Sequence, residues 1–172
     1  MKWLFIILFI ILFIIYLIPP SYGMDISING IDMKWFKNAS TKDCILMVAG
    51  GVVNIIIHES GHYLYSEINN LDVEFDRGKW IFYSNSKQEL RRSARSGYLL
   101  DSLVGLGLVT FYKDSYFTRG YTGTQAIGLT TYNLRNKKYN DFKTIKDNGG
   151  NSSIFYGGLA VVSAYTLYKQ DW

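Results

Sequence analysis

Two histidines and one glutamate carry the clearest chemistry in the sequence. His58, Glu59 and His62 form a His-Glu-x-x-His pattern, and these are the 2 histidines of the chain. On a helix, residues four positions apart lie on one face, so both imidazoles can bind the same ion, which in this pattern is zinc. Glu59 lies where its carboxylate can take a proton from a metal-activated water molecule. The pattern therefore predicts a zinc-dependent hydrolytic site with Glu59 as the catalytic acid and base.

A catalytic zinc ion takes three protein ligands and one water molecule. With both histidines used, the third ligand has to be a carboxylate, and four acidic residues are considered: Asp141, Asp101, Glu89 and Asp147. Asp101 interrupts an apolar stretch, where a charge is costly unless it has a function. Glu89 stands beside arginines and is equally typical of a solvated charge, whereas Asp147 precedes Asn-Gly-Gly, a sequence typical of a turn.

The zinc motif follows a long apolar stretch. Residues 43–68 are predicted to form one helix, with Thr41 or Asp43 as its N-cap. At 1.5 Å per residue, His58 would lie roughly 20 Å along this helix, inside a membrane but toward one face. Asn54 lies one turn before His58 on the same face, which predicts either that it orients a metal ligand or that it packs against a neighbouring helix.

The other predicted elements surround this helix. The sequence pattern predicts a β-hairpin, two apolar or partly apolar helices, a polar loop and a last apolar helix, over residues 71–85, 86–112, 116–134, 135–150 and 153–168. The expected fold is mostly α: a polytopic membrane helical bundle of about 4–5 spans, with a small β-hairpin after the zinc-binding helix. Residues 24–172 are expected to form a single membrane-embedded domain.

The first residues form an uninterrupted apolar run, WLFIILFIILFIIYLI, from Trp3 to Ile18. Two interpretations of residues 1–23 remain open. They form a membrane anchor, slightly shorter than the roughly 20 residues that a bilayer requires, or a signal peptide that ends in Ser-Tyr-Gly. The anchor is favoured because further apolar stretches follow, and the expected localisation is that of an integral, multi-pass membrane protein.

The composition supports a membrane setting. Of 172 residues, 48% are hydrophobic and 16% aromatic, and the long apolar runs alternate with strongly polar stretches. The net charge of +4 comes from basic clusters near Arg91 and Lys137, which is typical of membrane-flanking charge and not of a nucleic-acid surface. The 1 cysteine excludes a disulfide framework and a cysteine-based zinc site. The expected partners are therefore the lipid bilayer and a membrane-bound protein or peptide, without nucleic acid.

The order of the motifs resembles the site-2 protease family of intramembrane zinc metalloproteases. HESGH at residues 58–62 is similar to the family's HExGH span, and GYLLD at residues 97–101 resembles its G-x-x-x-N/S/G segment. The third similarity lies in NL at 133–134 and NDF at 140–142, where the family has Asn-Leu and then Leu-Asp-Gly. Asn133 and Asp141 are eight positions apart in this chain, as are the Asn and the Asp of the family's motif. The chain differs from the family in having no proline before Asp141 and in having Phe142 in place of Gly.

The resemblance implies a function and a further set of residues. By this resemblance Asp141 is the third zinc ligand, and Asn133 binds the substrate backbone or the developing oxyanion. The implied activity is that of a zinc-dependent endopeptidase acting on membrane-associated substrates. Two alternatives stay open: a zinc-binding membrane protein without protease activity, acting as a regulator or assembly factor, and a secreted, soluble zinc peptidase.

Overall fold

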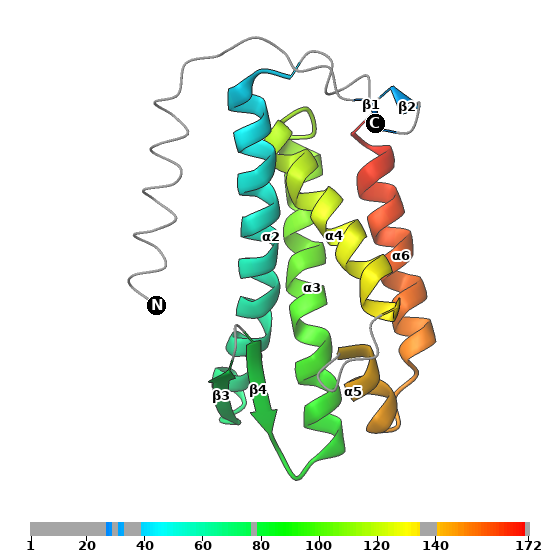
Figure 1. Ribbon diagram of the computed structural model, residues 1–172. Helices are drawn as coiled ribbons and strands as arrows, with labels where there is room; N and C mark the ends of the chain where they lie inside the picture. Colours follow the sequence, from blue (N-terminus) through cyan, green and yellow to red (C-terminus); the bar gives the residue numbers. More distant parts are fainter. Residues whose placement is uncertain (1–26, 29–30, 33–38, 77–78, 135–140, 171–172) are drawn as a thin grey trace.

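The computed structural model describes residues 27–28, 31–32, 39–76, 79–134 and 141–170. Its elements, labelled in Figure 1, are β1 (Ser27–Ile28), β2 (Ile31–Asp32), α2 (Thr41–Ile68), β3 (Asp72–Asp76), β4 (Lys79–Tyr83), α3 (Lys87–Phe111), α4 (Tyr116–Leu134), α5 (Asp141–Asp147) and α6 (Ser152–Tyr168). The described part is mostly helical, as predicted. The apolar segment of residues 1–23, predicted to be an anchor or signal peptide, lies outside the described residues.

Helix α2 is the longest element, with 28 residues, which corresponds to about 42 Å. Its N-cap is Ser40, so the prediction from the sequence that Thr41 or Asp43 caps the helix is wrong. Ser40 has the extended backbone that a cap requires, while Asp43 completes a capping box from the third helical position: the Ser40 N–H donates to Asp43 Oδ2 at 2.9 Å. Among the described residues, α2 is the one helix long and apolar enough to cross a membrane.

Four helices run along a common direction, and the hairpin β3–β4 and the short helix α5 lie toward the same end of the bundle (Figure 1). Helix α2 packs against α3 and α4, α4 against α6, and α5 against α3 and α6. The backbones approach closely where glycines lie at the crossings. A Cβ atom on Gly61 would lie 2.6 Å from the Ser96 carbonyl oxygen of α3, and a Cβ atom on Gly50 would collide with the Phe117 carbonyl of α4.

The hairpin and the helices α3, α4 and α6 occur where the sequence predicted them. Strands β3 and β4 pair antiparallel with Val73 opposite Phe82, and the hairpin lies beside the C-terminal end of α2. The predicted helices over residues 86–112, 116–134 and 153–168 differ from α3, α4 and α6 by no more than one residue at either end. Local apolar patterns and caps are therefore sufficient to predict these elements.

The predicted polar loop over residues 135–150 is wrong for its second half, because residues 141–147 form α5. Phe142 and Ile145 lie three positions apart and are 5% and 0% exposed, so one face of α5 is apolar and is buried against the bundle. The sequence does not predict this helix for two reasons. Two apolar residues in a basic stretch are too few to show a helical hydrophobic period, and a helix of 7 residues is unstable without tertiary contacts.

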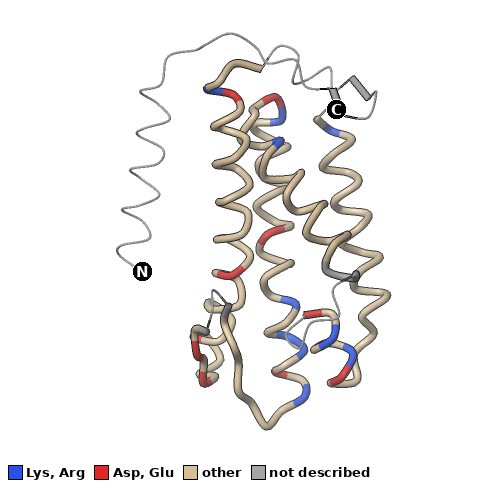
Figure 2. Tube along the Cα trace, in the orientation of Figure 1, with Lys and Arg blue, Asp and Glu red and all other residues tan. Residues whose placement is uncertain are grey.

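Charge and polarity are distributed unevenly over the bundle. Most charged residues lie toward its two ends, and the tube between them is nearly free of charge (Figure 2). Large apolar side chains are exposed on all four long helices, for example at Val48, Val52, Ile55, Leu99, Leu103, Ile127, Ile154 and Val161. The interior in turn holds many polar groups, among them Asn54, Asp101, Ser102, Thr118, Thr122, Gln125, Thr166 and Gln170. The bundle thus has an apolar outer surface and a partly polar core.

Candidate metal centre

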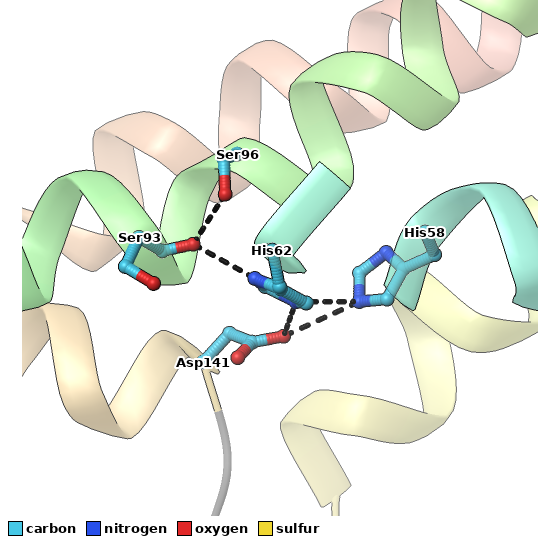
Figure 3. A network of polar contacts seen from close by, with 5 residues as sticks. All are labelled: His58, His62, Ser93, Ser96 and Asp141. Carbon is cyan, nitrogen blue, oxygen red and sulfur yellow. Dashed lines mark hydrogen bonds and ion pairs between the residues drawn. The ribbon is translucent and has the colours of Figure 1, made fainter. Parts of the chain in front are cut away.

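The structure brings His58, His62 and Asp141 together at the end of the bundle where α5 meets α2 and α3 (Figure 3). The Nε2 atoms of His58 and His62 lie 3.2 Å apart. Asp141 Oδ2 lies 3.4 Å from His58 Nε2 and 3.5 Å from His62 Nε2. Three potential ligand atoms thus form a nearly equilateral triangle, although Asp141 is about 80 residues downstream of the histidines.

This triangle has the dimensions of one face of a zinc coordination tetrahedron. Zinc–nitrogen and zinc–oxygen bonds of about 2.0–2.2 Å at tetrahedral angles place the ligand atoms about 3.3–3.5 Å apart. The side chains of His58 and Asp141 keep 12% and 19% of their surface exposed, whereas His62 keeps 4%. The three ligand atoms thus lie near the surface of the bundle without being fully exposed, and a catalytic zinc site keeps its fourth position for water.

His62 is held by the backbone of α3. Its Nδ1–H donates to the main-chain carbonyl oxygen of Ser93 at 2.7 Å, and the hydroxyl of Ser96 donates to the same oxygen at 2.6 Å (Figure 3). Because a carbonyl only accepts hydrogen bonds, this contact assigns the proton to Nδ1 and leaves the Nε2 lone pair directed at the triangle. The ring of Phe82 in β4 covers another side of His62, with 5.5 Å between ring centroids.

His58 is positioned by aromatic packing. The ring of Tyr98 meets it edge to face, with the centroids 4.4 Å apart. Tyr98 is 4% exposed and also packs against Phe142, with 5.2 Å between ring centroids. Since Phe142 directly follows Asp141, Tyr98 connects the first histidine to the helix that carries the carboxylate. This contact has no signal in the sequence, because tyrosine is frequent throughout the chain.

Asp141 is the first residue of α5, and its surroundings lower the pKa of its carboxyl group. Burial by itself would raise the pKa of this carboxyl group, but His62 and His58, which in their protonated forms attract the carboxylate and donate hydrogen bonds to it, hold its pKa well below the ordinary value. A metal ion requires a deprotonated carboxylate ligand, and Asp141 supplies one at neutral pH.

The other acidic residues considered for the third ligand lie elsewhere. Asp101 is buried one turn beyond Gly97 on α3, where its carboxylate accepts a hydrogen bond from Asn54 Nδ2 and its carbonyl accepts one from the Tyr121 hydroxyl at 3.1 Å. Glu89 accepts a hydrogen bond from the Tyr65 hydroxyl at 2.6 Å. Asp147 is exposed at the opposite end of α5 from Asp141.

Asn54, Glu59 and Asn133 are the other residues that the sequence placed at or near the site. The side-chain amide of Asn54 donates a hydrogen bond to Asp101 of α3, which is the contact with a neighbouring helix that the sequence predicted as one of two alternatives. Glu59 is half-buried beside His58 on α2. Asn133 belongs to the last turn of α4, but its side chain lies outside the described residues.

Comparison of the chain with protein-family models, with curated proteins and with solved structures finds no match. The assignment of a function therefore depends on the geometry of the site and on the surface of the bundle.

Proposed function

We propose that the protein is a zinc-dependent, membrane-embedded endopeptidase that hydrolyses peptide bonds of membrane-associated substrates. The observation that carries this proposal is the triangle of His58, His62 and Asp141, whose edges of 3.2, 3.4 and 3.5 Å suit a tetrahedral zinc ion. The sequence motif adds a glutamate next to the first histidine, and the resemblance to the site-2 protease family gives the same three ligands.

The chain's own residues have separate roles in this reaction. His58, His62 and Asp141 hold the ion, and the Ser93 carbonyl keeps His62 in the required tautomer. Glu59 accepts the proton of the attacking water molecule and delivers it to the leaving amine. A zinc ion at this site supplies Lewis acidity, lowering the pKa of a water ligand to about 7 and polarising the scissile carbonyl group. Asn133 is the proposed hydrogen-bond donor to the substrate.

The surface of the bundle supports a multi-pass arrangement in the membrane. Soluble monomers rarely expose large contiguous apolar patches, yet all four long helices of the described chain expose large apolar side chains. Among the described residues α2 alone is long and apolar enough to be a span by itself. The multi-pass arrangement therefore depends on the exposed apolar side chains of α3, α4 and α6, which are about 38, 28 and 26 Å long against a hydrocarbon core of about 30 Å. Part of their polar residues faces the interior, where for example Gln125 Nε2 donates a hydrogen bond to the Ser102 hydroxyl at 3.2 Å.

The hairpin offers a place for an extended substrate. Phe82 of β4 lies over His62, and Trp80 of the same strand packs on Tyr63 with 4.8 Å between ring centroids. A strand edge next to the site can pair with a peptide by β-addition, which would present its backbone to the zinc ion in the unfolded form that hydrolysis requires.

The test compares wild type with Glu59→Gln and His58→Ala. We expect the purified wild type to contain zinc and to cleave a detergent-solubilised, single-span test substrate. Glu59→Gln should keep the zinc and lose cleavage, because it removes the base but no ligand, whereas His58→Ala should lose both. Equal cleavage by all three proteins would contradict the proposal. If the wild type and Glu59→Gln retain zinc and neither cleaves the substrate, the result would favour a zinc-binding membrane protein without protease activity.

Membrane extraction tests the remaining alternative. An integral protein stays in the membrane fraction at alkaline pH in carbonate, whereas a secreted, soluble peptidase is released. We expect retention, because the apolar surface of the four helices would otherwise be exposed to water.

A further inference from the structure

We propose that Arg91 is a positioning residue for the metal site: it clamps the far end of α5 and thereby sets Asp141 against the two histidines. This inference depends on the proposed zinc site and adds a residue that neither the motif nor the ligand triangle includes. Arg91 touches none of the three ligands. It acts through the short helix that carries one of them.

Helix α5 needs external support. It has 7 residues, two turns, and a helix of this length is not stable in water without tertiary contacts. Asp141 is its first residue, so any rotation or shift of α5 moves the carboxylate directly. Zinc coordination tolerates deviations of only about 0.2 Å in the ligand distances. The orientation of α5 therefore decides whether Oδ2 completes the triangle.

Burial fixes one side of α5. Ile145 is fully buried, and Phe142 packs on Tyr98 and on the rings of Phe155 and Tyr156 in α6, with centroids 6.1 and 5.6 Å away. These contacts hold the apolar face against the bundle. Hydrophobic contacts are not directional, however, and they leave the polar end of the helix to be fixed by another group.

Arg91 supplies that directional contact. Its Nη1 donates a hydrogen bond to the main-chain carbonyl oxygen of Asn148 at 2.9 Å, just beyond the last residue of α5. The C-terminus of a helix carries partial negative charge, so the guanidinium is also electrostatically favourable there. Arg91 comes from the second turn of α3, next to the turn whose Ser93 carbonyl holds His62. One segment of α3 thus positions both a histidine and the carboxylate helix.

The turn after α5 is shaped to receive this side chain. Gly149 has a φ of +80°, which closes the helix end, and the Gly150 N–H donates to the Ile145 carbonyl at 2.8 Å. A Cβ atom on Gly150 would lie 2.9 Å from Arg91 Cδ and 2.7 Å from Ile145 Cγ2. The aliphatic part of Arg91 therefore passes against the bare backbone of Gly150, and a methyl group there would displace it.

Neighbouring arginines do not share this contact. Arg92 is 54% exposed and forms an ion pair with Glu89 of the same helix at 3.6 Å. The guanidinium of Arg95 lies over the Phe155 ring, 5.5 Å from its centroid. Arg92→Ala is therefore a matched control: it removes the same charge and side chain from the adjacent position without touching α5.

The experiment measures zinc affinity in the full-length protein in detergent, after removal of metal with a chelator. We expect Arg91→Ala to weaken zinc binding about 10- to 100-fold, as is typical for residues that orient ligands, and Arg92→Ala to leave it unchanged. Gly150→Ala should weaken binding in the same way as Arg91→Ala. Arg91→Lys should recover part of the loss, because lysine retains one donor and the positive charge.

A double-mutant cycle separates positioning from general stability. If Arg91 acts through Asp141, adding Arg91→Ala to Asp141→Ala produces no further loss of zinc affinity. The absorption spectrum of the cobalt(II)-substituted Arg91→Ala protein should also resemble that of Asp141→Ala, since both lose the carboxylate. Zinc affinity equal to wild type in Arg91→Ala and Gly150→Ala, or full additivity with Asp141→Ala, would overturn the inference. Absence of zinc binding in the wild type would instead overturn the proposed function.

Discussion

Gly97 of α3 lies directly against the imidazole of His62: a Cβ atom at this position would stand 2.5 Å from His62 Nε2 and 2.8 Å from the main-chain oxygen of His58. The glycine is part of the GYLLD motif that resembles the second conserved segment of the site-2 protease family. Its lack of a side chain thus leaves room for the His62 imidazole and for the close approach of α2 and α3.

The first prediction concerns this glycine. Gly97→Ala should reduce zinc affinity by more than about 100-fold, because the new methyl group occupies the space next to the ligand atom and displaces a metal ligand directly. Gly107→Ala on the same helix is the control, since a Cβ atom there would meet no other atom within 4 Å. Metal content after dialysis and a zinc titration measure the difference. Equal affinities of the two variants would contradict the geometry.

The second prediction concerns the carboxylate ligand. Asp141→Ala should weaken zinc binding by more than about 100-fold, because it removes a direct ligand and not only a supporting group. Asp147→Ala removes an exposed carboxylate from the opposite end of the same helix and should have no effect. Undiminished zinc binding in Asp141→Ala would show that the third ligand is another acid, and Asp101→Ala would be the next variant to measure.

The third prediction concerns pH. The pKa of Asp141 is held well below its ordinary value by His62 and His58, against the opposing effect of burial, so its carboxylate stays ionised over the neutral and mildly acidic range. Zinc, by contrast, requires the neutral form of an imidazole ligand, which a proton on the ligating nitrogen excludes. Zinc affinity should therefore fall as the pH decreases from about 7.5 to about 5.5, because protons compete for the histidines.

The number of protons released distinguishes the ligands. A plot of log Kd against pH has a negative slope, because Kd increases as the pH falls. Two histidine ligands allow the magnitude of this slope to approach two at the acidic end of the range, and Asp141 adds no further proton. Zinc titrations at several pH values in buffers of constant ionic strength give this slope. A slope approaching three above about pH 5 would mean that the Asp141 carboxyl is protonated there, against the direction of its pKa shift.

The fourth prediction separates the buried Asn54–Asp101 contact from the metal site. Asn54→Ala should lower the free energy of unfolding by about 2 kcal/mol, because it removes the side-chain donor from a buried carboxylate. Asn69→Ala, at the exposed end of α2, should change it by less than about 0.5 kcal/mol. Denaturation in detergent, followed by circular dichroism, measures both. Zinc affinity should stay unchanged in Asn54→Ala, and a large loss there would assign Asn54 to the site.

Local sequence determined most of the secondary structure and the two histidines of the candidate metal site. The His-Glu-x-x-His spacing places His58 and His62 on one face of any helix, and the apolar runs, the caps and the turn residues define α2, the hairpin, α3, α4 and α6. The same local patterns could not identify α5, because Phe142 and Ile145 become an apolar face only when the bundle buries them.

Tertiary structure alone decided the rest. Four carboxylates could have supplied the third ligand, and the distances of 3.4 and 3.5 Å from Asp141 Oδ2 to the two histidines depend on how α5 docks. Ser93 acts through its own main-chain carbonyl, and Arg91 donates to the main-chain carbonyl of Asn148. Every residue has such a carbonyl, so the amino-acid sequence does not indicate which of them form these contacts. Spacing along one helix is fixed by covalent geometry, whereas a ligand about 80 residues away is placed only by the packing of the elements between.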